Sequence, residues 1–126
     1  MTGQQIFLAF GALFGFIGVA TGAFGAHLLR SRLSIEFLNT FEVGVRYQLY
    51  HAFALIGVAL LMHLFPSSWF LTAGWLFMIG TLIFSGSLYI LVLTGVKSWG
   101  AVTPVGGLLL LAGWFSLFLG SFFIRS

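Results

Sequence analysis

Residues 69–94, WFLTAGWLFMIGTLIFSGSLYILVLT, form one uninterrupted apolar run without Asp, Glu, Lys or Arg. About 20 residues of α-helix cross the hydrocarbon core of a bilayer, so this run is long enough to span a membrane. A strand of a membrane β-barrel would instead alternate apolar and polar residues over about 10 positions. The run therefore predicts a transmembrane helix.

The rest of the 126-residue chain has the same character. Only 6% of its residues are charged and 60% are hydrophobic, and the mean hydropathy is +1.15. A soluble domain carries roughly 25% charged residues, so most of this surface must face lipid. Apolar stretches predict spans at about residues 5–26, 47–64 and 101–124, in addition to 69–94. We expect an all-α integral membrane four-helix bundle that forms one transmembrane domain over residues 1–126.

The first span and the connection after it have distinct signals. Residues 1–5 contain no Lys or Arg, whereas a signal peptide starts with a basic segment, so we expect this span to be retained. In residues 34–46, apolar side chains recur every three or four positions, which predicts an amphipathic helix that Ser34 can cap. We expect an interfacial amphipathic helix between the first and second spans, running into the second with a bend at Gly44.

The positive charges are distributed unevenly between the two sides of the membrane. Arg30, Arg32, Arg46 and Lys97 lie on the side that holds the first and third connections, and Arg125 lies on the other side. Cytoplasmic loops carry an excess of Lys and Arg. We therefore predict a multi-pass protein of the bacterial cytoplasmic (inner) membrane, with both termini outside the cytoplasm.

Glycines repeat at near-heptad spacing in the first and last spans. Lipid tails are as apolar as leucine, so helices in a bilayer associate through the close backbone contact that small residues permit. We predict helix-packing seams at these positions and expect the first seam to face a helix of the same chain. The last seam has two possible partners, a helix of this chain or of a neighbour. The glycines are Gly11, Gly15, Gly18, Gly22, Gly25, Gly106, Gly113 and Gly120.

Glu42, Arg46 and Tyr50 lie four residues apart on one face of the predicted helix. An acid four residues before an arginine is the favourable order for a helix ion pair. A charge at the centre of the bilayer would cost about 2.5–3.5 kcal/mol on the insertion scale, so we place the pair at the interface. Two interpretations stay open: an anchor that sets the depth of the second span, or a site that handles a headgroup, an ion or a proton.

The histidines His27 and His51 lie near the charged side of the membrane, on adjacent spans. Such a pair could bind haem or a metal, but neither histidine belongs to a pair with ligand spacing. We favour an interhelical hydrogen-bond network formed by His51 together with Tyr47, Gln48 and Tyr50, and we expect no cofactor and no metal.

Ser85, Ser87 and Tyr89 interrupt the apolar run of the third span. A nucleophilic serine would need a Gly-x-Ser-x-Gly turn or a base with an orienting acid, and the sequence offers neither. Serines in membrane helices usually bond to their own backbone or to a neighbouring helix. We expect these residues to be structural, and we predict that the protein is not an enzyme.

Other classes of partner are limited by composition. The chain has no cysteine, and its net charge of +3 is dispersed. Without a basic cluster or a recognition module, we expect no binding to nucleic acid. The expected partners are membrane lipids, with a homo-oligomer or a larger membrane complex as a possible assembly.

Five short motifs occur in order along the chain: GAFGAH at 22–27, YQLYHA at 47–52, FSGSLY at 84–89, TPVGG at 103–107 and GW at 113–114. Together they resemble the small bacterial inner-membrane proteins grouped as domain of unknown function 423, which have mitochondrial relatives. The resemblance spans essentially the whole chain and implies a four-helix membrane protein. It implies no activity and supplies no catalytic residues. The motif residues that it marks for inspection are His27, Tyr47, Gln48, His51, Ser85, Ser87 and Tyr89.

Two functions follow as expectations. The first is a structural or accessory membrane component that acts by helix packing or by docking to other membrane proteins. The alternative is a small transporter or channel, or a lipid- or quinone-binding protein, that uses the polar cluster at the start of the second span. A cavity or groove that reaches His51 or Glu42 would favour the alternative.

Overall fold

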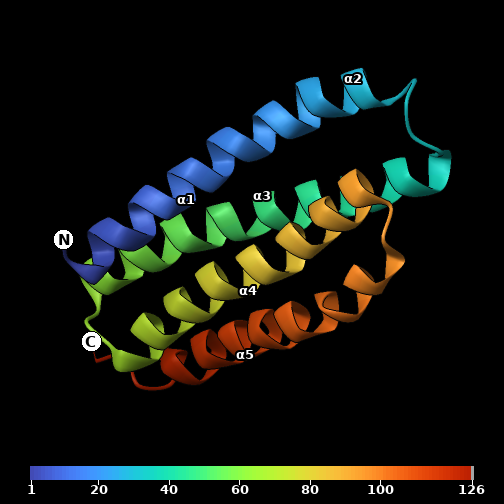
Figure 1. Ribbon diagram of the computed structural model, residues 1–126. Coiled ribbons are helices and arrows are strands. Elements are labelled where there is room, and N and C mark those ends of the chain that lie inside the picture. The colour runs from blue at the N-terminus through green and yellow to red at the C-terminus, as the bar shows by residue number, and fades with distance from the viewer. Residues whose placement is uncertain (126) are drawn as a thin grey trace.

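Four long antiparallel helices make up the protein in the computed structural model, which describes residues 1–125 (Figure 1). All four are long and apolar enough to cross a membrane, and the described residues contain no strand. The predicted all-α membrane fold is therefore confirmed. The elements are α1 (Gly3–Ala20), the π-helical turn η1 (Thr21–Gly25), α2 (Ala26–Leu29), α3 (Ile35–Leu64), α4 (Ser68–Thr94), the 3₁₀ turn η2 (Lys97–Ala101) and α5 (Thr103–Ser121).

Local sequence signals set the helix ends. Thr2 and Gln5 form a capping box at the start of α1, and the side chain of Ser34 accepts a hydrogen bond from the amide of Phe37 at the start of α3. Helix α4 ends at Thr94 and is capped by Gly95, whose φ of 71° is a left-handed conformation that glycine adopts without strain. The predicted Ser34 cap is thus present, and each long helix begins or ends where its residues favour it.

The segment at residues 34–46 is not a separate helix. It is the first part of α3, which continues without interruption from Ile35 to Leu64. Gly44 lies within this continuous helix and contacts α4: a Cβ at this position would lie 2.9 Å from Cε1 of Tyr89. The glycine therefore lets α4 approach α3 closely.

The helices pack in chain order rather than around one common axis (Figure 1). Helix α3 packs against α1 and α4, and α5 packs against α4. Among the described residues, no Cα of α5 comes within 8 Å of a Cα of α1 or α3. Helices α1 and α5 are therefore the two edges of the array, and both ends of the chain lie at the same end of the molecule.

The glycine seam of the first span, which covers α1 and η1, faces α3 along its whole length. A Cβ would lie 2.7 Å from Leu49 if placed on Gly18, and 3.0 Å from Val45 if placed on Gly22. The remaining seam positions meet α3 as well: Gly11 against Ile56, Ala52 and Leu55, Gly15 against Ala52, and Gly25 against Phe41.

The glycine seam of α5 faces α4, so it too is used within the chain. Gly106 is the tightest position, because a Cβ there would lie 2.5 Å from the backbone nitrogen of Phe84. The other two seam positions meet aromatic side chains of α4, Gly113 against Phe77 and Gly120 against Trp69 and Phe70. The two seams therefore hold the outer helices α1 and α5 onto the central pair α3 and α4.

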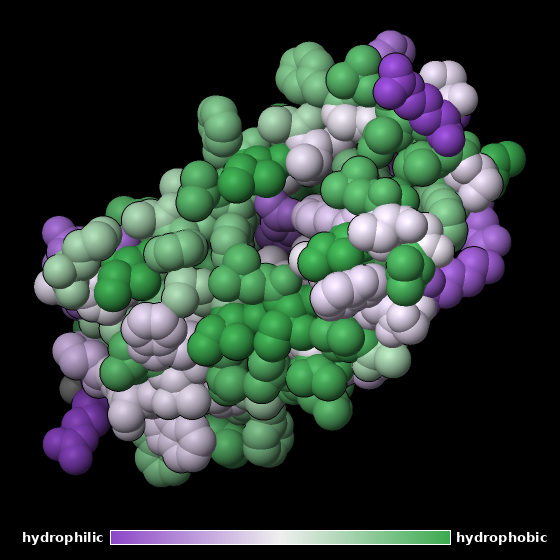
Figure 2. All heavy atoms as spheres, in the orientation of Figure 1, coloured by the Kyte–Doolittle hydropathy of each residue, from purple (hydrophilic) through white to green (hydrophobic). Residues whose placement is uncertain are grey.

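The core and the surface are both apolar. Phe7 and Phe77 are fully buried, and Phe7 packs so closely on Gly74 that a Cβ there would overlap its ring. Large apolar side chains also cover the outside of every long helix. On the face in Figure 2, the hydrophilic residues gather at the two ends and a broad hydrophobic band lies between them, as a bilayer requires.

Candidate functional site

Seven of the ten predicted polar residues line three separate hollows on the sides of α3, rather than one site. We call them the His51 groove, the Gln48 recess and the Arg46 notch. All three lie in the half of the protein nearer the first and third connections, since their α3 residues belong to the range 42–51.

Both ring nitrogens of His51 are engaged. The side chain is buried, with 4% of its surface exposed. Nδ1 lies 2.6 Å from the backbone oxygen of Tyr47, and Nε2 accepts a hydrogen bond of 3.1 Å from the indole N–H of Trp114. A carbonyl only accepts and an indole N–H only donates. These contacts therefore select the neutral tautomer with the proton on Nδ1.

The His51 groove runs between α3 and α5 over α4 and has a volume of about 570 Å³. Its walls carry aromatic rings, among them Tyr47 and Phe84 with ring centroids 4.7 Å apart. From Pro104 to Trp114 it follows α5 for about 15 Å, close to half of the roughly 30 Å hydrocarbon core. The full lining is Tyr47, His51, Phe84, Pro104, Gly107, Leu108, Leu110, Leu111 and Trp114.

Gln48 links three helices through one amide group. Its Nε2 donates a hydrogen bond of 2.9 Å to the backbone oxygen of Phe14 in α1. Its Oε1 accepts a hydrogen bond of 2.6 Å from the hydroxyl of Tyr89 in α4. The side chain is only 5% exposed, so these bonds supply the polar contacts that lipid cannot.

The Gln48 recess is a smaller hollow of about 180 Å³ between α1 and α4. Within it, Ser85 donates a hydrogen bond of 2.7 Å to the backbone oxygen of Gly44. Thr81 is 2% exposed, and its hydroxyl has no hydrogen-bond partner among the described residues. A recessed hydrophilic patch is visible in the middle of the face in Figure 2. The lining is Phe14, Ile17, Gln48, Thr81, Leu82, Ser85, Gly86 and Tyr89.

The Arg46 notch lies between α3 and the end of the first span, with a volume of about 270 Å³. It is lined by Glu42, Val45 and Arg46 on one side and by Gly22 and Ala26 on the other. The predicted Glu42–Arg46 ion pair is wrong: within the described part of the chain, the one ion pair closer than 4.0 Å joins Lys97 to Glu36. Both charged side chains are exposed and face the notch instead.

The other candidate residues are dispersed. His27 lies exposed on α2 and shares neither a hollow nor a hydrogen bond with His51. Tyr50 is 53% exposed, with its ring edge-on to Tyr47. Ser87 joins α4 to α5 through a hydrogen bond of 2.6 Å with the hydroxyl of Thr103. Residues 1–125 contain no group of three His, Asp or Glu side chains placed to hold a metal.

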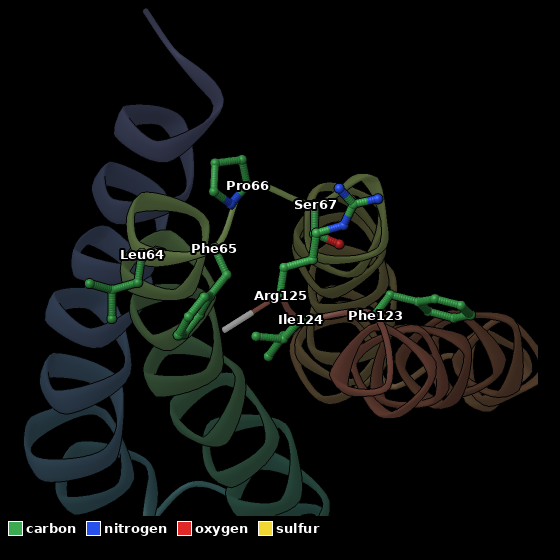
Figure 3. A pocket seen from close by; sticks show the side chains of 7 residues that line it. All are labelled: Leu64, Phe65, Pro66, Ser67, Phe123, Ile124 and Arg125. Carbon is green, nitrogen blue, oxygen red and sulfur yellow. The ribbon is translucent and has the colours of Figure 1, made fainter.

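A further pocket of about 260 Å³ lies at the opposite end of the molecule. It is formed by the α3–α4 turn and the segment after α5, and Figure 3 shows Phe65 and Ile124 pointing into the space between them. Arg125 extends past Ser67 at the start of α4 (Figure 3). None of the candidate polar residues lines this pocket, so it is separate from the three hollows around α3.

Sequence reasoning missed two residues that the structure brings into the site. Trp114 was visible only as part of the Gly113-Trp114 motif, and its partner His51 lies 63 positions earlier. Thr81 is flanked by apolar residues and belongs to no motif. The heptad spacing of Gly106 and Gly113 was the signal that could have placed Trp114 beside the seam.

Comparison with known proteins shows that this chain is similar to the members of one protein family. The family described as "Protein of unknown function (DUF423)" matches residues 21–107. The chain is 43% identical over 121 residues to UPF0382 membrane protein SH2409 of Staphylococcus haemolyticus, covering 94% of this chain and 97% of that protein. It is 41% identical over 118 residues to UPF0382 inner membrane protein YgdD of Escherichia coli (strain K12), covering 94% and 90%. No solved structure matches the chain.

Proposed function

This chain belongs to the family described as "Protein of unknown function (DUF423)", and on that premise we propose that it is a non-enzymatic accessory protein of the inner membrane that holds a lipid or quinone tail in the His51 groove. The observation that carries this proposal is the groove itself. It reaches His51, opens to the side of α3 and α5 where lipid lies, and has a lining dominated by apolar and aromatic residues.

The dimensions of the groove suit one apolar tail. It extends for about 15 Å, which is the depth of one leaflet of the hydrocarbon core. Binding sites for apolar ligands are mostly hydrophobic clefts of about 300–1,000 Å³ with a few polar groups, and 570 Å³ falls within this range. The aromatic rings of Tyr47, Phe84 and Trp114 offer flat surfaces for a ring or a chain.

The chemistry of His51 supports a binding role rather than a catalytic one. Its two ring nitrogens are occupied by the backbone oxygen of Tyr47 and the indole N–H of Trp114. A general base needs a free nitrogen within hydrogen-bond reach of the proton that it takes. We therefore propose that His51 closes the inner end of the groove and takes no part in catalysis.

The experiment extracts the protein from membranes in polymer nanodiscs and identifies the co-purifying lipids and quinones by mass spectrometry. A Gly107→Leu variant places a side chain in the groove, and Gly57→Leu is the control because Gly57 faces open space on α3. We expect one phospholipid or quinone species to be enriched over the bulk membrane with the wild type and the control, and lost with Gly107→Leu. Equal lipid and quinone profiles for all three proteins would refute the proposal.

We also propose that both termini lie outside the cytoplasm. The support is the uneven charge, with Arg30, Arg32 and Lys97 at one end and Arg125 at the other. A reporter fused to the C-terminus that is active only in the cytoplasm should be inactive, and its activity would overturn this orientation.

Association with other subunits is a second part of the proposed accessory role. The seams of α1 and α5 are filled by α3 and α4, so an oligomer or a larger complex would use the exposed apolar outer faces of the helices instead of these seams. Native mass spectrometry from mild detergent would report such an assembly directly. A strictly monomeric protein without co-purifying subunits would leave membrane lipids as the only partners in this proposal.

A further inference from the structure

The Arg46 notch lies at the level of the lipid headgroups. Helix α3 has 30 residues, ending at Leu64, and about 20 of them are enough to cross the hydrocarbon core. Counted back from Leu64, these residues reach position 45. Arg46 therefore lies at the edge of the core, and Glu42 lies one turn further out, among the headgroups.

The opposite wall of the notch lies at the same depth and is built from small residues. Gly22 belongs to the π-helical turn Thr21–Gly25, and Ala26 follows it. A Cβ on Gly22 would lie 3.0 Å from Val45, which confirms that this wall is in contact with α3. Short π-helical turns within α-helices occur frequently at functional sites. Here the turn and its small side chains leave an open volume of about 270 Å³ beside two charged groups.

Two opposite charges line this notch without pairing with each other. Glu42 before Arg46 is the order that favours an ion pair along a helix, yet no such pair forms within the described residues. Four residues of helix separate the two charges by about 6 Å along the axis. The notch therefore presents a cation at the edge of the hydrocarbon core and an anion farther out.

We propose that the Arg46 notch binds the headgroup of a zwitterionic phospholipid with a primary ammonium, phosphoethanolamine in chemical terms. In such a lipid the phosphate lies next to the glycerol and the ammonium lies two carbons farther out, the same order as Arg46 and Glu42. The guanidinium holds a phosphate by charge-assisted hydrogen bonds. The carboxylate accepts hydrogen bonds from the ammonium, which a choline headgroup cannot donate.

The net charge of the notch argues against a purely anionic lipid. Arg46 is the only cation among its lining residues, and Glu42 offsets it. A phosphoglycerol headgroup would gain the contact with Arg46 but would meet the carboxylate without a positive group to pair with it. The notch lies on the α1 side of α3 and the His51 groove on the α5 side, so the headgroup site does not depend on the proposed function of the groove.

The test is a lipid titration followed by native mass spectrometry, with phosphatidylethanolamine, phosphatidylcholine and phosphatidylglycerol of identical acyl chains. We expect the wild type to bind the ethanolamine lipid about two- to fivefold more tightly than either of the others, the size expected for one partly exposed ion pair. Equal affinities for the ethanolamine and choline lipids would overturn the proposal without any variant.

Two variants separate the roles of the charges. Glu42→Gln should abolish the preference for ethanolamine over choline, and Arg46→Gln should weaken binding of all three lipids. Glu36→Gln is the matched control, because Glu36 lies on the same exposed part of α3 but pairs with Lys97 outside the notch. Retention of the ethanolamine preference in Glu42→Gln, or its loss in Glu36→Gln, would refute the proposal that Glu42 binds the ammonium. In either case the lipid profile of the Gly107→Leu variant still reports on the His51 groove alone.

Discussion

The indole N–H of Trp114 donates a hydrogen bond of 3.1 Å to Nε2 of His51, and so joins α5 to α3, two helices whose backbones do not meet. Helix α4 lies between them and contributes Phe77, whose ring lies 4.9 Å from that of Trp114 and 5.4 Å from that of His51. The His51 groove exists because two long side chains, rather than the helix backbones, close the gap between α3 and α5.

Trp114→Phe should weaken this closure. The phenyl ring can still pack on Phe77, but Nε2 of His51 loses its donor and remains buried without a partner. We expect the free energy of unfolding to fall by about 1–3 kcal/mol, the cost of leaving a buried polar group without a partner. Equilibrium unfolding in detergent measures the change. Trp75→Phe is the control, since Trp75 packs edge-on to Phe7 and its N–H makes no hydrogen bond within residues 1–125. Equal losses in the two variants would contradict the role given to the Trp114 N–H.

The glycines at 106 and 107 should respond differently to alanine. A Cβ on Gly106 would lie 2.5 Å from the backbone nitrogen of Phe84 and 2.8 Å from its Cα, so α5 would have to move away from α4. At Gly107 the nearest atom is the ring carbon Cδ2 of Phe84, 3.8 Å away, which is ordinary contact. We expect Gly106→Ala to destabilise the protein by about 1–3 kcal/mol, as overpacking does. Gly107→Ala should be close to neutral, and thermal unfolding of the two purified proteins makes the comparison.

Gln48 and Tyr89 should be energetically coupled. Gln48→Leu removes both the acceptor of the Tyr89 hydroxyl and the donor to Phe14, whereas Tyr89→Phe removes only the hydroxyl. A double-mutant cycle isolates the interaction that the two side chains share. We expect a coupling of about 0.6 kcal/mol, the average for hydrogen bonds between membrane helices, with about 1.7 kcal/mol as the upper end. Strictly additive effects would show that the two side chains do not interact in the folded protein.

Thr81→Val should not destabilise the protein. Valine has nearly the shape of threonine, and the hydroxyl that it removes is buried without a partner among residues 1–125. An unsatisfied buried polar group costs about 1–3 kcal/mol, so the variant should match or exceed the stability of the wild type. Ser85→Ala is the comparison, because Ser85 does have a partner in Gly44 and its loss should destabilise. A marked loss of stability in Thr81→Val would mean that a bound molecule in the Gln48 recess satisfies the hydroxyl.

Much of the secondary structure follows from residue patterns. Four apolar runs predicted four spans, and the structure has helices at each of them, with Ser34 as the cap of α3 as expected. The ends of the helices were predicted less well than their presence. Helix α1 continues through a π-helical turn into α2, which ends at Leu29, and α5 ends at Ser121 rather than near residue 124. Helix ends depend on the few hydrogen bonds of the last turn, which apolar patterns do not encode.

The candidate site was less predictable, because most of its contacts join residues far apart in the chain. Gln48, His51, Ser85 and Tyr89 were marked as polar groups in apolar surroundings, and each bonds to another part of the backbone or to another helix. The spacing of Glu42 and Arg46 suggested a pair that does not form. Helical spacing places two side chains on one face, but their rotamers decide whether they meet.

The sequence by itself determined that this protein spans a bilayer as four helices. It also determined the positions at which small residues allow helices to pack closely. These properties depend on composition and local spacing, because a chain with 6% charged residues cannot cover its surface with polar groups in water. Only the tertiary structure decided which helices meet, and so that Trp114 reaches His51, that His27 stays apart, and that Glu42 and Arg46 face an open notch. These contacts depend on how α1 packs on α3 and α5 packs on α4, because the relative positions of the helices determine which of their side chains meet.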